Sequence, residues 1–239
     1  MPPGSSTSWD ARSRPLAEPV IRTAAARRLA FAAGLAVALA ACGDAPVPSV
    51  SLDACPTAAP TADQAATILG DADSVVVDTS LGTFRIELYA EAAPIAAANF
   101  VSLARCGFYT EITFHRVIAD FVIQAGDPQT RSNRGEFEGI GSGGPGYQFA
   151  IEPPADGHRY EQYTVAMANA SRPDTNGSQF FVDLANLDAR LDRLYTIFGK
   201  VVEGTDVVDA IGRVGTSGPD RYVPLEPVII ESMTVESAS

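Results

Sequence analysis

Histidine and cysteine are scarce in this chain of 239 residues, which contains two His and three Cys. His115, His158 and the cysteines do not show the spacing of a zinc site. No serine lies in the Gly-x-Ser-x-Gly motif of a hydrolase nucleophile. The sequence therefore offers no constellation for a nucleophile, a metal or a redox cofactor, and we expect a function that needs no cofactor and no metal.

Positive charge is also in short supply, because the formal net charge is −12. Five of the arginines and only two acidic residues precede Cys42, which leaves 12 basic and 27 acidic residues and a net charge of −15 for the remainder. A body of this charge repels phosphate backbones, so a nucleic-acid partner is disfavoured. The hydrophobic content of 46% and charged content of 19% are those of a globular protein.

One glycine-rich segment matches a dinucleotide-binding pattern. Gly139 to Gly144 read Gly-x-Gly-x-x-Gly, but Pro145 and Gly146 follow where that motif requires a helix. We therefore interpret this segment as a loop and not as a dinucleotide-binding site.

The N-terminal region has the pattern of an export signal. Arg22, Arg27 and Arg28 precede an uncharged apolar run, Leu29 to Ala41, which is too short to span a bilayer. The run ends in Leu39-Ala40-Ala41-Cys42. This sequence resembles the lipobox of bacterial lipoproteins, which implies a signal peptide over residues 1–41, lipidation of Cys42 and attachment to a membrane. The alternative is an ordinary signal peptide with an incidental cysteine.

Residues 42–72 are rich in Pro, Ala and Thr and are interpreted as a tether carrying the lipidated cysteine. A short helix is expected over residues 63–69, with Thr61 as its N-cap. Cys55 in this segment and Cys106 beyond it can form a disulfide in an oxidising compartment. Two independent thiols remain the alternative, because sequence does not fix the geometry of a pair.

The rest of the chain alternates with period two in many short segments, which predicts a sandwich or barrel. Helices are expected over residues 95–106, after Pro94 and before Gly107, and over residues 205–211. The expected strands cover residues 74–79, 83–89, 113–118, 121–125, 165–168, 179–184, 196–201 and 228–235.

Arg116 and Gln124 stand out within this pattern. They are eight positions apart among alternating apolar residues, so they can share one face of a strand-built wall. A cation and an amide on such a wall suit a binding surface that is partly polar and partly apolar. Taken alone, the same pattern fits an arginine on a solvated strand face.

Residues 114–127 (FHRVIADFVIQAGD) resemble the central motif of the cyclophilins, which are peptidyl-prolyl cis-trans isomerases. Three further blocks are similar to that family and occur in its order. They are Met167-Ala-Asn-Ala170, Asn176-Gly-Ser-Gln-Phe-Phe181 and Phe198-Gly-Lys-Val-Val202. The resemblance covers a domain over residues 73–236 and implies a closed eight-stranded antiparallel β-barrel with two capping helices.

The resemblance also implies the site. Arg116 matches the catalytic arginine of the family, with Gln124 beside it. The residues expected to bind substrate are Phe121, Val122, Ala168, Asn169, Ala170, Gln179, Phe181, Leu191 and Tyr195. Val122 replaces a more usual methionine and Arg190 stands where well-known members carry Trp, so cyclosporin affinity does not follow from the resemblance.

We therefore expect an isomerase that accelerates X-Pro rotation during the folding of exported proteins. The alternative is a proline-peptide-binding chaperone or assembly module whose turnover is incidental. The expected partners are proline-containing polypeptides and a membrane reached through the N-terminal lipid, and a small acidic domain on a tether is expected to be a monomer.

Overall fold

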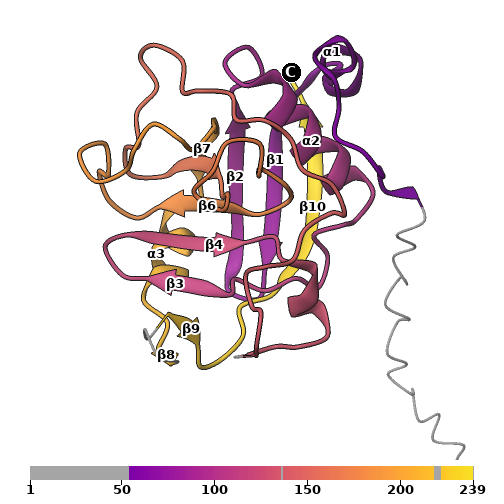
Figure 1. Cartoon of the computed structure of the whole chain (residues 1–239). Coiled ribbons are helices and arrows are strands. Elements are labelled where there is room, and N and C mark those ends of the chain that lie inside the picture. Colours follow the sequence, from indigo (N-terminus) through magenta and orange to yellow (C-terminus); the bar gives the residue numbers. More distant parts are fainter. Residues whose placement is uncertain (1–53, 136, 218–221, 239) are drawn as a thin grey trace, which may run out of the picture. The chain divides into compact units, whose positions relative to one another are not determined.

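The computed structural model describes residues 54–135, 137–217 and 222–238 (Figure 1). The expected signal peptide and Cys42 lie outside these ranges. The helices are α1 (Ala62–Leu69), α2 (Pro94–Arg105) and α3 (Thr205–Gly212), with a 3₁₀ helix, η2 (Pro128–Arg131). The strands are β1 (Ala72–Thr79), β2 (Gly82–Leu88), β3 (Arg116–Ile118), β4 (Val122–Ala125), β5 (Thr164–Met167), β6 (Phe180–Asp183), β7 (Ile197–Glu203), β8 (Thr216–Ser217), β9 (Val223–Pro224) and β10 (Ile230–Ser237).

Eight of these strands form one antiparallel sheet in the order β10-β1-β2-β7-β5-β6-β4-β3. Each corresponds to one strand expected from the sequence, with ends that differ by a few residues. In Figure 1 the strands β3, β4 and β6 cross the direction of β1, β2 and β10, so the sheet is strongly curled. The fold is therefore mainly β, as predicted.

The closed barrel is not confirmed, because the paired strands form an open half-barrel with β10 and β3 at its ends. Between them, Thr113 and Ile229 form an isolated bridge, and the N–H of Phe114 donates to the Val228 carbonyl at 2.9 Å. The chain then bends into β3, where the Val117 N–H donates instead to the Tyr222 carbonyl at 2.7 Å. The outer edge of β3 thus bonds the segment before β9 rather than β10.

Helix α2 occupies the centre of the main core. Its Phe100 ring lies 5.2 Å from the ring of Tyr109, 5.3 Å from Phe180 and 4.9 Å from Phe198, measured between centroids. The helix starts at Pro94 without a side-chain cap of its own. The carboxylate of Glu152 supplies one from a distant loop, accepting the N–H groups of Ile95 at 2.9 Å and Ala96 at 2.8 Å.

Part of the expected tether packs on the domain. Helix α1 begins with the predicted cap at Thr61, contacts α2 and buries Ala65 and Leu69 in the main core. The two capping helices implied by the resemblance correspond to α2 and α3. The short helix expected after Thr61 corresponds to α1. Residues from Cys55 onward therefore include side chains that pack on the domain, upstream of the expected boundary at 73.

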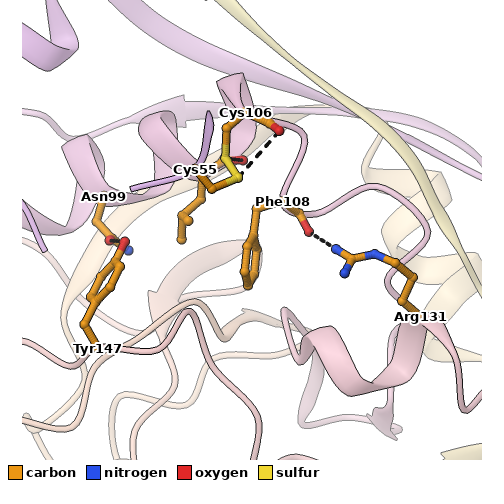
Figure 2. The surroundings of a disulfide bond; sticks show 7 residues. Cys55, Asn99, Cys106, Phe108, Arg131 and Tyr147 are labelled. Atoms are coloured by element: carbon orange, nitrogen blue, oxygen red, sulfur yellow. Dashed lines mark hydrogen bonds between the residues drawn. A yellow bond between two sulfur atoms is a disulfide. The ribbon is translucent and has the colours of Figure 1, made fainter. Parts of the chain in front are cut away.

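Cys55 and Cys106 form a disulfide, with 2.07 Å between the sulfur atoms, that joins this N-terminal segment to the end of α2 (Figure 2). Close by, Arg131 from η2 donates to the Phe108 carbonyl at 2.5 Å. In the middle of α2, the Tyr147 hydroxyl donates to the side-chain carbonyl of Asn99 at 2.8 Å (Figure 2). Helix α2 is therefore linked to the N-terminal segment at its end and to the loop that carries Tyr147 through Asn99.

We expect the double substitution Cys55→Ser and Cys106→Ser to lower the free energy of unfolding by about 2–4 kcal/mol, since the bond closes a long loop in the unfolded chain. Chemical denaturation of the two proteins measures the difference. A reducing agent should destabilise the parent to a similar extent and leave the double variant unchanged. Equal stability of the parent with and without reductant would contradict the expectation.

Candidate active site

Arg116 and Gln124 are brought together by the β3–β4 hairpin. They are direct partners in its antiparallel register, on two adjacent strands rather than along one. The turn between the strands includes Asp120, whose φ of 56° lies in the left-handed region that Asp tolerates better than most residues. Because cross-strand partners share a face of the sheet, the prediction that Arg116 and Gln124 can lie on one face is confirmed.

A chain of hydrogen bonds continues from this pair. Nη1 of Arg116 lies 3.4 Å from Oε1 of Gln124, whose Nε2 donates to Oε1 of Gln179 at 2.9 Å. Nε2 of Gln179 donates in turn to the carbonyls of Gly141 at 2.8 Å and Gly143 at 2.7 Å. Because carbonyls only accept, they fix the orientation of the Gln179 amide, and through it that of Gln124. The oxygen of Gln124 therefore faces Arg116.

The glycine-rich segment that resembles a dinucleotide motif supports this chain. Buried Asp127 accepts the N–H of Gly141 at 2.7 Å, which ties this loop to the segment that follows β4. A Cβ on Gly143 would lie 2.0 Å from the Asp127 carboxylate, so only glycine fits there without movement. The glycines thus permit close packing of the loop against the polar chain.

Apolar side chains near Arg116 form a cluster separate from the main core. Its buried members are Val122, Tyr160, Ala166, Phe181, Leu187 and Ile197, and its partly buried members include Phe121, Ala168, Leu191 and Tyr195. The rings of Phe181 and Tyr195 meet edge to face, with centroids 5.4 Å apart.

A pocket of about 550 Å³ opens between this cluster and Arg116, and we call it the first pocket. Nine of the eleven site residues expected from the sequence line it. They are Arg116, Phe121, Val122, Gln124, Ala168, Asn169, Phe181, Leu191 and Tyr195.

A second pocket, of about 770 Å³, adjoins the first and shares Gln124, Gly141, Ala168 and Asn169 with it. The two remaining expected residues, Ala170 and Gln179, line this second pocket. The Asn169 side chain shapes its edge, donating to the Leu194 carbonyl at 2.8 Å and accepting the Ser171 N–H at 2.9 Å. All eleven expected residues therefore lie around two adjoining depressions.

The Arg116 guanidinium is half-buried. No carboxylate among the residues that the structure describes forms an ion pair with it. Burial lowers its pKa from the ordinary value, and the nearby hydroxyls of Tyr195 and Tyr222 oppose the change. An arginine has so high a pKa that it stays charged in proteins. Arg116 therefore presents a full positive charge to the first pocket.

Several residues that line the pockets are not among those expected from the sequence. Tyr222 and Ile140 line the first pocket, and the loop from Gly141 to Gln148 lines the second. These residues lie in segments without periodicity, so no pattern signals their position. His115 also lines the first pocket. Its side chain is almost fully buried, and burial lowers its pKa to about 4.

Over the described ranges, no group of three or more His, Cys, Asp or Glu side chains is arranged to hold a metal ion. Within the same ranges, no helix is both long and apolar enough to span a bilayer.

Comparisons with known proteins place these features in a family. Residues 74–235 match the family model described as cyclophilin type peptidyl-prolyl cis-trans isomerase/CLD. The chain is 44% identical over 165 residues to peptidyl-prolyl cis-trans isomerase-like 1 of Aspergillus oryzae, covering 69% of this chain and 97% of that protein. It is 40% identical over 179 residues to peptidyl-prolyl cis-trans isomerase A of Mycobacterium tuberculosis, covering 68% and 91%.

The chain belongs to the cyclophilin-type peptidyl-prolyl cis-trans isomerases.

Solved structures agree. A Cryptosporidium parvum cyclophilin is 30% identical and superposes with a TM-score of 0.61, covering 70% of this chain and 99% of that one. A second structure of the same protein, obtained in the presence of the dipeptide Ala-Pro, gives 31% identity and a TM-score of 0.60, covering 69% and 99%. The family and the enzyme class predicted from the sequence are thus confirmed.

This cyclophilin carries a buried carboxyl group beneath the first pocket. Asp183 on β6 is fully buried and lies two residues after Phe181, so both side chains point to the face of the apolar cluster. Neither carboxyl oxygen has a hydrogen-bond partner among the described residues. Burial disfavours the charged form and raises the pKa of Asp183 to about 8.

We expect the contribution of Asp183 to the stability of this cyclophilin to fall as pH rises from about 4 to about 8. Native Asp183 keeps its proton up to a pKa of about 8, whereas the unfolded side chain loses it near 3.8. The native state therefore binds the extra proton in this interval, and the group contributes a loss of about 1.4 kcal/mol per pH unit. Asp183→Asn removes this contribution, so its advantage over the parent should grow with pH.

Denaturant unfolding of both proteins at several pH values between 5 and 9 measures this difference. Titration of His115 is common to both proteins and cancels. Asp192→Asn makes the same replacement at an exposed position, and as the matched control its stability should stay within about 0.5 kcal/mol of that of the parent. Parallel profiles for Asp183→Asn and the parent would show that Asp183 is ionised in the native state.

Proposed function

We propose that this cyclophilin is an exported, lipid-anchored enzyme that accelerates X-Pro isomerisation in exported polypeptides. The observation that carries the catalytic part is Arg116, a cation without a carboxylate partner in the described part of the chain, at the edge of the apolar first pocket. The export context rests on the sequence of the N-terminal region. The Cys55–Cys106 disulfide supports it, because such bonds persist in oxidising compartments.

The task requires no proton transfer and no covalent intermediate. Conjugation between nitrogen and carbonyl raises a barrier of about 18–20 kcal/mol to rotation of the peptide bond. The trans form of an X-Pro bond is favoured by only about 0.5–1 kcal/mol, so both isomers occur and interconvert slowly. An enzyme needs only to bind the twisted bond more strongly than either planar form.

Arg116 is suited to this selective binding. Twisting localises a lone pair on the prolyl nitrogen and returns charge to that atom, which a fixed guanidinium can stabilise by donating a hydrogen bond. Gln124 holds one side of the guanidinium, and Gln179 and the loop carbonyls hold Gln124. The donor is therefore positioned before substrate arrives.

The apolar part of the first pocket would hold the prolyl ring. Val122, Phe181 and Leu191 supply apolar surface without hydrogen-bonding demands, which suits a ring that lacks an N–H. The structure of the Cryptosporidium relative in the presence of Ala-Pro supports an X-Pro ligand for this fold. The segment from Ala168 to Ala170 would carry the neighbouring residues of the peptide along the shared edge of the two pockets.

We expect Arg116→Ala to lower kcat/KM for an Ala-Pro peptide by about 100-fold or more, because it removes a donor that acts on the twisted state. The dissociation constant for the same peptide, measured by NMR titration, should change much less. Arg213→Ala, an exposed position on the end of α3, is the control and should retain activity.

An equal loss of binding and turnover in Arg116→Ala would assign the arginine to ground-state binding. A parent protein that binds the peptide but does not accelerate its isomerisation would support the alternative, a proline-peptide clamp.

Replacement of Cys42 tests the anchor. In cells that process lipoproteins, we expect the parent protein in the membrane fraction and Cys42→Ser in the soluble fraction, because acyl chains provide the attachment. Cys55→Ser removes a different cysteine and should stay with the membrane. Membrane retention of Cys42→Ser would argue against lipidation at this residue.

A further inference from the structure

Two arginines lie against the same aromatic ring at the first pocket. The guanidinium carbon of Arg190 is 4.8 Å from the ring centroid of Phe121, and that of Arg116 is 5.6 Å from it. Arg190 is further held by a hydrogen bond of 3.1 Å from Nη1 to the Asp120 carbonyl. The Arg190 side chain is thus fixed beside the pocket although the residue is exposed.

Neither arginine is neutralised within the described part of the chain. The ion pairs found there engage other cations and do not include Arg116 or Arg190. Asp192, two positions after Arg190, also forms no ion pair there. In a protein with a net charge of −12, two unpaired cations on one ring form a local positive site.

The position of Arg190 relative to the two pockets determines which flank of a bound peptide lies beside this charge. The second pocket adjoins the first through Gln124, Gly141, Ala168 and Asn169. Phe121 and Leu191, the residues next to Arg190, line the first pocket and not the second. A peptide that crosses both pockets therefore has one flank in the second pocket and the other beside Arg190.

We infer that Arg190 is a specificity-determining residue that selects X-Pro substrates with an acidic side chain on the flank away from the second pocket. A guanidinium stacked on Phe121 keeps free N–H groups at its edge, and these match a carboxylate. Stacking and the Asp120 carbonyl limit the side-chain entropy lost on binding. This inference rests on the proposed isomerase function and adds the class of substrate that the enzyme prefers.

The test uses two series of short Ala-Pro peptides. One series carries Glu, Gln or Lys directly after proline, and the other carries the same residues two positions before it. In one series only, we expect kcat/KM for the Glu peptide to exceed that for the Gln peptide by about two- to fivefold. This factor corresponds to the free energy of a single exposed ion pair. The preference should shrink at high ionic strength.

Arg190→Gln should abolish the preference for Glu, so that the ratio of kcat/KM for the Glu peptide to that for the Gln peptide falls to about one. Arg190→Lys should retain part of the preference, because it keeps the charge but loses the planar stacking. Arg213→Gln is the charge-matched control at a position that lines neither pocket and should behave as the parent.

No preference for Glu in either series, an equal preference in both, or a preference that survives Arg190→Gln would overturn the inference. Failure of the proposed isomerase function gives a different result, since all peptides, including the neutral ones, would then lack catalysis.

Discussion

The site depends on burial of both faces of the short strands β4, β5 and β6. Ile123, Val165 and Val182 point to the main core, while their neighbours Val122, Ala166 and Phe181 point to the cluster beneath the first pocket. A slip of one residue would exchange the two sets and place pocket residues in the core. Because neither face is free to meet solvent, packing of the core fixes the register, and the register fixes which apolar side chains reach the pocket.

The polar half of the site follows from the same register. Pairing of β3 with β4 sets Arg116 opposite Gln124, and Gln179 immediately precedes β6, which pairs with β4. The hydrogen bonds from Gln179 to the carbonyls of the glycine-rich loop then fix the direction of both amides. An arginine on an isolated hairpin would sample many rotamers, whereas this one is held by a chain that ends on main-chain atoms.

The sequence was informative where periodicity and neighbourhood along the chain determine structure. Alternation revealed the eight strands of the sheet, and the Arg116–Gln124 pair lay within a single hairpin. Sequence reasoning was less informative where distant segments meet. The bond from Val117 to the segment at Tyr222, which leaves the sheet open, has no local signal. The cap that Glu152 supplies to α2 and the burial of Asp183 likewise depend on contacts between residues far apart in the chain.

The proposed mechanism places two conflicting requirements on the group beside Arg116, and an amide meets both. The arginine must be held in one orientation, and a carboxylate would hold it most strongly. A carboxylate would also neutralise the charge that the twisted peptide bond needs. The oxygen of Gln124 accepts from the guanidinium without adding a charge, and the positive charge stays available to the first pocket. The same reasoning accounts for the nearby phenols of Tyr195 and Tyr222, which are polar neighbours of Arg116 that carry no carboxylate.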